Sequence, residues 1–265
     1  MYQIGNLAAK ERKEWLKMKR EEFCKLIDYS ILWQNRSKES IEKRSREVIQ
    51  YGFACLCCYP TDVPIAKNII GDNASISGVV GFPVGYETTK TKVHEALVAI
   101  DNGANEIDVV MNIARFKDGD YDYVLDEFKQ IVEAAKNRKS DCIVKVIIET
   151  PHLKERKELA KACELVIDSG ADYVKNATGF ATGYDGTGDS GYTDEMVDPY
   201  DNAAIDNVKA MCEIVNGRIK VKSSGNPKDL DECLYYIQEL GVSRIGNDYI
   251  PEWLEEAGED YWKDK

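Results

Sequence analysis

The chain has 265 residues, of which 43% are hydrophobic and 31% charged, a composition typical of a globular protein with one sizeable core. Its 35 lysines and arginines against 47 aspartates and glutamates give a net charge of −12, which disfavours nonspecific binding to nucleic acid or to an anionic membrane surface. No apolar run approaches the roughly 20 residues that cross a bilayer, and the charged stretch 1–20 has no apolar centre, so we expect no transmembrane helix, no signal peptide and a cytoplasmic location.

Short apolar runs alternate along the chain with longer amphipathic stretches, which is the pattern of a parallel sheet wrapped by helices. We predict eight strands, at Ile27–Ile31, Phe53–Tyr59, Ile76–Phe82, Glu106–Asn112, Cys142–Glu149, Tyr173–Thr178, Ile219–Ser223 and Arg244–Asn247. Helices are predicted at Lys38–Tyr51, Thr88–Asn102, Tyr121–Lys139, Leu153–Ser169, Asn202–Asn216, Pro227–Leu240 and Pro251–Ala257. Eight such units favour a closed (β/α)8 TIM barrel over the alternative, an open doubly wound sheet.

The whole chain, residues 1–265, is expected to form one barrel domain with an N-terminal helical extension over residues 1–26. Within this extension, an extra helix is predicted from about Leu7 to Leu26, covering the barrel's N-terminal end or a subunit contact. Residues 179–201 are rich in glycine and acidic side chains and predict a long acidic loop, either a functional lid or a locally disordered segment.

The cysteines and histidines argue against a metal site. The eight cysteines are scattered without any C-x-x-C pair, which favours reduced, buried thiols. The two histidines, His94 and His152, belong to no metal-binding spacing. We therefore expect no metal and no cofactor.

Charged residues lie within several predicted strands, where burial on both faces makes an ionisable side chain costly unless it is paired or functional. They are Asp108, Lys145, Lys175 and Lys222. Ion pairing is the structural interpretation, with Lys145 expected to pair with Asp108 or Glu149. Lys175 and Lys222 have no obvious partner and lie toward the carboxyl ends of their strands, where barrel active sites are built.

Two such lysines suggest covalent chemistry. A second ammonium group lowers the pKa of the first, and an unprotonated lysine attacks a carbonyl to form a Schiff base whose cationic nitrogen stabilises an enamine. A carboxylate such as Asp108 can then move protons. This combination indicates an aldolase that needs no metal.

The strand segments also carry motifs with a recognisable order and spacing over about residues 25–250. The segments are Gly81-Phe82-Pro83, Thr88 to Lys92, Asn102 to Asp108, Val144 to Thr150, Gly170 to Lys175, Thr178-Gly179-Phe180 and Val221-Lys222. Together they resemble the deoxyribose-phosphate aldolase family. The resemblance implies a class I aldolase, a lyase on a (β/α)8 barrel, that cleaves 2-deoxyribose 5-phosphate reversibly to acetaldehyde and glyceraldehyde 3-phosphate.

By the same resemblance, Lys175 matches the Schiff-base lysine, Lys222 the lysine that lowers its pKa, and Asp108 the proton-shuttling aspartate. Residues expected to bind substrate are Asp28, Ser30, Cys57, Lys145, Thr178, Gly179, Gly225, Asn226, Lys228, Gly246 and Asp248. For Cys57, a purely structural place in the core is the alternative. Lys145 is expected to form a structural pair with Glu149, or alternatively to orient Asp108 or tune Lys175.

The sequence departs from the family where the phosphate is bound. Asn226 replaces a glycine, Pro227 removes a backbone donor, and Asp248 stands where a serine is expected. A carboxylate near a phosphate dianion costs roughly 1 to 4 kcal/mol at 4 Å, although Lys228 stands about where the family has an arginine. An unphosphorylated or differently substituted deoxy sugar is therefore an alternative substrate.

Other functions and partners follow from these expectations. A non-catalytic sugar-binding barrel is the second alternative, and a nucleotide-cofactor enzyme is disfavoured because Thr178 to Gly183 comes late in the chain without an immediate helix. The expected partners are a sugar or sugar phosphate and aldehydes, with no nucleic acid and no membrane, and a homo-oligomer is left open.

Near the C-terminus, Tyr261 and Trp262 are expected to pack on a neighbouring helix, the alternative being a place over the barrel mouth.

Overall fold

The computed structural model describes residues 18–153, 155–180, 202–225 and 227–263. Eight parallel strands close into a barrel in which each strand pairs with the next one along the chain and the last pairs with the first. The strands are β1 (Ile27–Ser30), β2 (Cys55–Cys58), β3 (Ser75–Val80), β4 (Glu106–Val110), β5 (Ile143–Ile147), β6 (Tyr173–Lys175), β7 (Lys220–Ser224) and β8 (Arg244–Asn247). The predicted barrel is confirmed, and the open doubly wound sheet is wrong.

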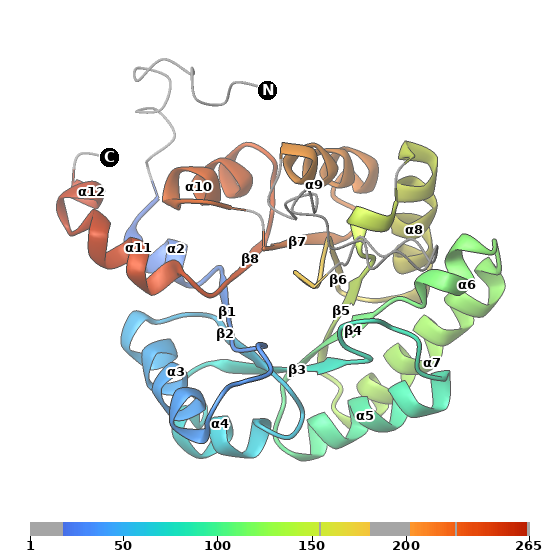
Figure 1. The fold of residues 1–265 in the computed structure, drawn as a ribbon, viewed down its shortest axis with the longest axis horizontal. Helices are drawn as coiled ribbons and strands as arrows, with labels where there is room; N and C mark the ends of the chain where they lie inside the picture. The colour runs from blue at the N-terminus through green and yellow to red at the C-terminus, as the bar shows by residue number, and fades with distance from the viewer. Residues whose placement is uncertain (1–17, 154, 181–201, 226, 264–265) are drawn as a thin grey trace.

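Helices lie outside the ring of strands (Figure 1). They are α2 (Arg20–Cys24), α3 (Lys38–Tyr51), α4 (Val63–Ile70), α5 (Thr89–Asp101), α6 (Ile113–Lys117), α7 (Tyr121–Arg138), α8 (Arg156–Ser169), α9 (Asn202–Val215), α10 (Leu230–Gln238), α11 (Ile250–Ala257) and α12 (Asp260–Lys263), with a 3-10 turn, η2 (Thr150–His152). None of the helices in these ranges is long and apolar enough to span a membrane.

Local signals in the sequence explain the ends of the main helices. The side chain of Ser37 caps α3 by accepting the backbone N–H of Ser40, and α3 ends at Gly52, whose φ of 71° suits a residue without a Cβ atom. Asp229 caps α10 in the same way. The turn at Gly52 ends α3 shortly before β2 begins at Cys55.

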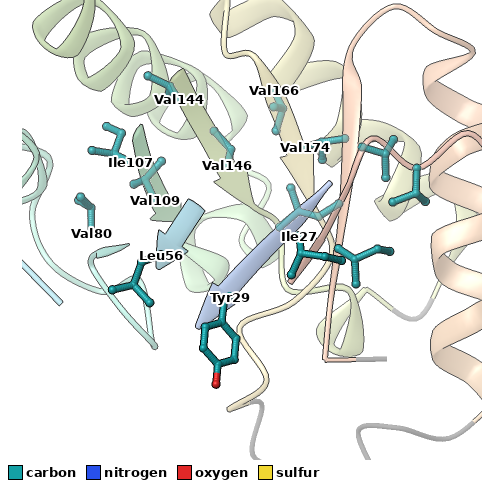
Figure 2. Packing of buried hydrophobic residues seen from close by; sticks show 14 of the residues in the cluster. Ile27, Tyr29, Leu56, Val80, Ile107, Val109, Val144, Val146, Val166 and Val174 are labelled. Carbon is teal, nitrogen blue, oxygen red and sulfur yellow. The ribbon is translucent and has the colours of Figure 1, made fainter. Parts of the chain in front are cut away.

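The main hydrophobic core lies between the strands and the helices. Alternate strand residues project into it, among them Ile107 and Val109 of β4 and Val144 and Val146 of β5, all fully buried (Figure 2). Since successive strand residues point to opposite faces, the residues between them point into the barrel. On β4 and β5 these inward residues include the charged side chains singled out above.

Several predicted features differ in the structure. The helices α4 and α6, of eight and five residues, are too short to show a clear helical period in the sequence. Of the N-terminal helix predicted from Leu7 to Leu26, the structure describes α2 within residues 18–26; residues 1–17 and the loop at 181–201 lie outside the described residues. All eight cysteines are free thiols and seven are buried, as predicted.

At the C-terminus, Tyr261 donates a hydrogen bond from its hydroxyl to Asp231 of α10, at 2.7 Å. The ring of Trp262 packs against Phe23 of α2, with ring centroids 5.6 Å apart. Both residues therefore pack on neighbouring helices, as expected, and neither lines the mouth of the barrel.

Candidate active site

A network of buried charges fills the barrel interior, and Asp108 is at its centre. Asp108 Oδ2 accepts from Lys175 Nζ at 2.9 Å and from Lys222 Nζ at 2.8 Å. Asp108 Oδ1 accepts from Lys145 Nζ at 3.0 Å and from the Ser77 hydroxyl at 2.7 Å. One carboxylate therefore joins three lysines from the consecutive strands β5, β6 and β7.

A second layer of the network lies toward β1 and β8. Asp28 Oδ2 pairs with Lys222 Nζ at 2.6 Å and with Lys145 Nζ at 3.0 Å, and Asp28 Oδ1 accepts from Arg244 at 2.6 Å. Glu106 pairs with Lys145 as well. Arg244 and Glu106 were not singled out in the sequence, although each is a charged residue at the start of a predicted strand.

The network determines the protonation of its members. Burial raises the pKa of Asp108, but Lys145, Lys222 and Lys175 outweigh burial and hold it well below its usual value. Burial lowers the pKa of Lys222, but Asp108 and Asp28 outweigh burial and raise it. Lys222 is thus a fixed cation, and the expectation that Lys175 and Lys222 have no partner is wrong because Asp108 pairs with both.

Three potential metal ligands also meet in this interior. Asp28, Cys55 and Glu106 offer ligand atoms within 4.8 Å of one another, and all three are buried. The ammonium of Lys145 pairs with both carboxylates of this group. Arg244 pairs with both as well, so two of the chain's own cations balance the two carboxylates of this triad.

Glu149 plays a different part from the one expected. Its Oε1 accepts the backbone N–H of Thr178 at 3.0 Å, and no ion pair joins it to Lys145 among the described residues. Its φ of 51° is unusual for a residue with a side chain and marks local strain. Burial raises the pKa of Glu149 despite the hydrogen bond from Thr178. The predicted Lys145–Glu149 pair is therefore wrong, while the Lys145–Asp108 pair is confirmed.

A pocket of about 420 Å³ opens above the network, at the carboxyl ends of β1, β6, β7 and β8. Predicted site residues that line it are Lys175, Lys222, Asp28, Ser30, Cys57, Thr178, Gly179, Gly225, Lys228, Gly246 and Asp248. Asp108 and Lys145 are buried and do not line it, and Asn226 lies outside the described residues. Lys145 is therefore placed to hold the carboxylates rather than to touch a substrate.

Gly246 shows how closely the walls of this pocket pack. A Cβ atom at this position would lie 2.1 Å from Ser224 Oγ and 3.1 Å from Lys222 Cε. Any larger residue would therefore force Ser224 Oγ to move and would crowd the side chain of Lys222. Substrate binding by Gly246 stays a prediction, and the packing adds that this glycine makes room for Ser224 and Lys222.

Further residues line the pocket that the sequence did not assign to substrate binding. They are Leu32, Trp33, Phe180, Ser224, Pro227, Asn247, Tyr249 and Trp253. Trp33 and Tyr249 directly follow the first and last strands, a position that does signal the active end of a barrel. Aromatic residues in such loops are common for structural reasons, so their type alone did not identify them.

A closed barrel with a lysine-rich, buried site at the carboxyl ends of its strands defines a barrel enzyme able to carry out covalent amine chemistry. Residues 23–239 match the model of the DeoC/LacD family of aldolases. The chain belongs to this family and is an aldolase, a lyase.

Individual relatives agree with this assignment. The chain is 38% identical over 234 residues to the deoxyribose-phosphate aldolase of Caldanaerobacter subterraneus subsp. tengcongensis, covering 86% of this chain and 92% of the relative. It is 37% identical over 228 residues to the enzyme of the same name from Thermococcus gammatolerans, covering 85% and 92%.

Solved structures with the same fold include an aldolase, QR15, at a TM-score of 0.72 and 33% identity, covering 86% of this chain and 91% of that one. Another is the deoxyribose-phosphate aldolase of Aeropyrum pernix, described as tetrameric, at a TM-score of 0.76 and 25% identity, covering 94% and 97%. Both structures are aldolases, in agreement with the family model.

Proposed function

We propose that this chain is a class I aldolase that reversibly cleaves 2-deoxy-D-ribose 5-phosphate to acetaldehyde and D-glyceraldehyde 3-phosphate through a Schiff base on Lys175. The observation that carries the proposal is the placing of Lys175 at the end of β6, lining the pocket and 2.9 Å from Asp108. The sugar phosphate is the substrate class in the names of the curated relatives.

Charge balance favours Lys175 as the nucleophile. The network holds four cations, Lys145, Lys175, Lys222 and Arg244, against three carboxylates, those of Asp28, Glu106 and Asp108. Loss of one proton from a lysine would make the network as a whole neutral. This loss is favoured because an excess charge in a buried site is costly. Lys175 is paired with one of these carboxylates, whereas Lys222 is paired with two and Lys145 with three. Lys175 therefore has the fewest carboxylate partners of the three lysines, and we assign it as the nucleophile.

The neutral amine of Lys175 attacks C1 of the open-chain sugar, and loss of water gives the protonated imine. A base removes the proton of the C3 hydroxyl, the C2–C3 bond breaks, and its electron pair moves toward the imine to leave an enamine. The shortened aldehyde departs. Protonation of the enamine at C2 and hydrolysis of the imine release acetaldehyde and restore the lysine.

Asp108 is the group best placed to serve these proton transfers. Its Oδ2 lies within hydrogen-bond distance of the Lys175 amine, so it can accept the proton that the amine loses during attack, directly or through water. Lys222 holds Asp108 from the other side and adds fixed positive charge beside the nucleophile. We assign Lys222 the electrostatic role and Asp108 the proton-transfer role.

A second candidate is cleavage of an unphosphorylated deoxy sugar, which is favoured by the carboxylate of Asp248 in the pocket wall. The bond cleaved and the lysine used are the same in both cases. A non-catalytic sugar-binding barrel is disfavoured, because binding alone gives no reason to bury three lysines around one carboxylate.

Acetaldehyde release from 2-deoxy-D-ribose 5-phosphate tests the proposal, with wild type and Lys175→Met assayed side by side. We expect steady release by wild type, unaffected by a strong metal chelator, and none above background by the variant. Release at an undiminished rate by Lys175→Met would contradict the proposal.

A further inference from the structure

The residues that follow β7 and β8 form one wall of the pocket. If the chain has the proposed function, on which this inference rests, the acceptor half of the substrate, which leaves as the shortened aldehyde, lies against this wall. This is the end of a barrel where phosphate groups are usually bound, by free backbone N–H groups and a helix N-terminus. In this chain it comprises Gly225, Pro227, Lys228, Asn247 and Asp248, all of which line the pocket.

Three backbone donors at this end are engaged within the chain. Gly225 donates its N–H to the carbonyl of Gly246 at 3.1 Å, and Lys228 donates its N–H to Glu232 Oε2 at 2.8 Å. Tyr249 donates its N–H to Asn247 Oδ1 at 2.6 Å. Position 227 is a proline and has no N–H to offer. A phosphate could use these three N–H groups only by displacing these contacts.

The N-terminus of α10 is occupied as well. Asp229 Oδ1 accepts the N–H of Glu232 at 2.8 Å, so the chain's own carboxylate takes the place that an anion would need. Asp231 and Glu232 add two more acidic side chains in the first turn of the helix. The helix therefore repels an anionic ligand rather than attracting one.

Asp248 brings a carboxylate directly into the pocket wall. It makes no ion pair with any residue that the structure describes. The guanidinium of Arg44 is stacked on Tyr29 and Trp33 and donates to the backbone carbonyl of Asp248 at 3.0 Å. Burial raises the pKa of the Asp248 carboxyl despite the charge of Arg44, which shows that it is short of compensating partners.

Aromatic side chains complete this end of the pocket. Trp33, Tyr249 and Trp253 line it, and the rings of Tyr249 and Trp253 stack with centroids 6.4 Å apart. A carboxylate beside aromatic faces suits a hydroxylated, uncharged ligand: the carboxylate accepts a hydrogen bond from a hydroxyl and the rings cover C–H groups.

We infer that Asp248 determines acceptor specificity and gives this aldolase an activity toward unphosphorylated 2-deoxy sugars, by accepting a hydrogen bond from the terminal hydroxyl. Lys228, an exposed cation that also lines the pocket, attracts a phosphate, and Asp248 counteracts it. The chain then cleaves both free and phosphorylated sugars, with the balance between them set by one carboxylate.

The test is the ratio of kcat/KM for 2-deoxy-D-ribose to that for its 5-phosphate, measured by acetaldehyde release with the full chain. Asp248→Asn and Asp248→Ser are compared with Glu252→Gln, which makes the same charge change one turn further on, outside the pocket lining. We expect the ratio to fall about tenfold or more in both Asp248 variants, mainly through a gain on the phosphate. In Glu252→Gln it should stay within about twofold of wild type.

Two results would overturn the inference and leave the proposed function intact. One is a ratio that is unchanged in both Asp248 variants. The other is a wild-type protein that cleaves 2-deoxy-D-ribose 5-phosphate but not 2-deoxy-D-ribose. Absence of acetaldehyde from either sugar with wild type would instead overturn the proposed function. Lys175→Met serves as the inactive control in every assay.

Discussion

Lys175 and Lys222 are register partners on the neighbouring strands β6 and β7, and their ammonium groups both donate to one oxygen, Asp108 Oδ2. Two lysines that share a carboxylate oxygen cannot be treated independently. Loss of the proton of one ammonium group changes the electrostatic environment of the other, because the two groups are joined through Asp108 Oδ2 by hydrogen bonds of 2.9 and 2.8 Å.

Replacing Lys175 by arginine separates charge from nucleophilicity. Arg keeps a cation beside Asp108 but stays protonated and forms no Schiff base, so we expect the fold to persist and kcat to fall by more than about a thousandfold. Circular dichroism and the rate of acetaldehyde release measure the two effects. Lys161→Arg on α8, where the ammonium lies over the ring of Tyr121 and takes no part in the network, is the matched control. Residual activity within tenfold of wild type would count against Lys175.

Replacing Asp108 by asparagine removes the proton acceptor and the common partner of three lysines. We expect kcat to fall by about 10² to 10⁴, and the free energy of unfolding to fall by about 3 to 5 kcal/mol because buried ammonium groups lose their counter-charge. Ser77→Ala, which removes one hydrogen bond to the same carboxylate, should cost about 1 kcal/mol. Urea unfolding and single-turnover rates give both quantities. A variant as active as wild type would exclude the proton-transfer role.

The network predicts how stability varies with pH. Asp28 and Asp108 have pKa values held below the ordinary 3.8, so their contribution is fully present above about pH 4 and is lost as the pH falls through the lowered values. Lys222 has a pKa raised above 10.5, so its contribution is present below that pH and is lost as the pH rises through the raised value. We therefore expect a plateau in unfolding free energy at intermediate pH.

The effect of Glu149 on the free energy of unfolding changes with pH in the opposite direction to that of the aspartates. Because burial raises its pKa in the folded state, its contribution grows as the pH falls toward 4.5 and partly offsets the loss from the aspartates. Urea unfolding measured at one-unit steps of pH checks the plateau. A contribution from Asp28, Asp108 and Lys222 that collapsed between pH 6 and 8, where none of these three groups changes charge, would contradict the assignment.

A second buried ion pair lies outside the site. It tests whether removal of one partner of a buried ion pair is as costly elsewhere in this fold as in the network. Lys92 Nζ on α5 lies 2.7 Å from Glu127 Oε1 on α7, and both side chains are fully buried. Either single replacement, Lys92→Met or Glu127→Gln, should cost about 3 to 5 kcal/mol, and the double replacement less than the sum. Lys38→Met, in an exposed pair with Glu42, should cost less than about 1 kcal/mol. Additive losses at Lys92 and Glu127 would show that the pair is not coupled.

The barrel was predictable from the sequence because its strands are short apolar runs and its main helices begin and end at recognisable caps. The predicted α3 and β8 have the observed bounds, and most other strands lose one to three residues at an end. The short helices α4 and α6 were missed because one or two turns do not establish a period. The inward charges were recognisable because they interrupt otherwise apolar strands.

The pairing inside the barrel could not be predicted in the same way. Which lysine meets which carboxylate depends on the register between strands, such as Asp108 opposite Lys145 and Lys175 opposite Lys222. The sequence carries no direct record of that register, so Lys145 was also matched to Glu149 and Arg244 was overlooked. The capped amides at Lys228 and Tyr249 likewise depend on loop geometry rather than on residue type.

The central claim is the covalent role of Lys175, and reductive trapping tests it most directly. The full chain is incubated with acetaldehyde and sodium borohydride, digested, and mapped by mass spectrometry. We predict an added ethyl group on Lys175 in wild type. The fraction of Lys175 that carries this group should be smaller when Asp108 is replaced by asparagine, and position 175 should carry none in Lys175→Arg. An ethyl group confined to Lys222 or spread over surface lysines, with Lys175 unmodified, would contradict the account.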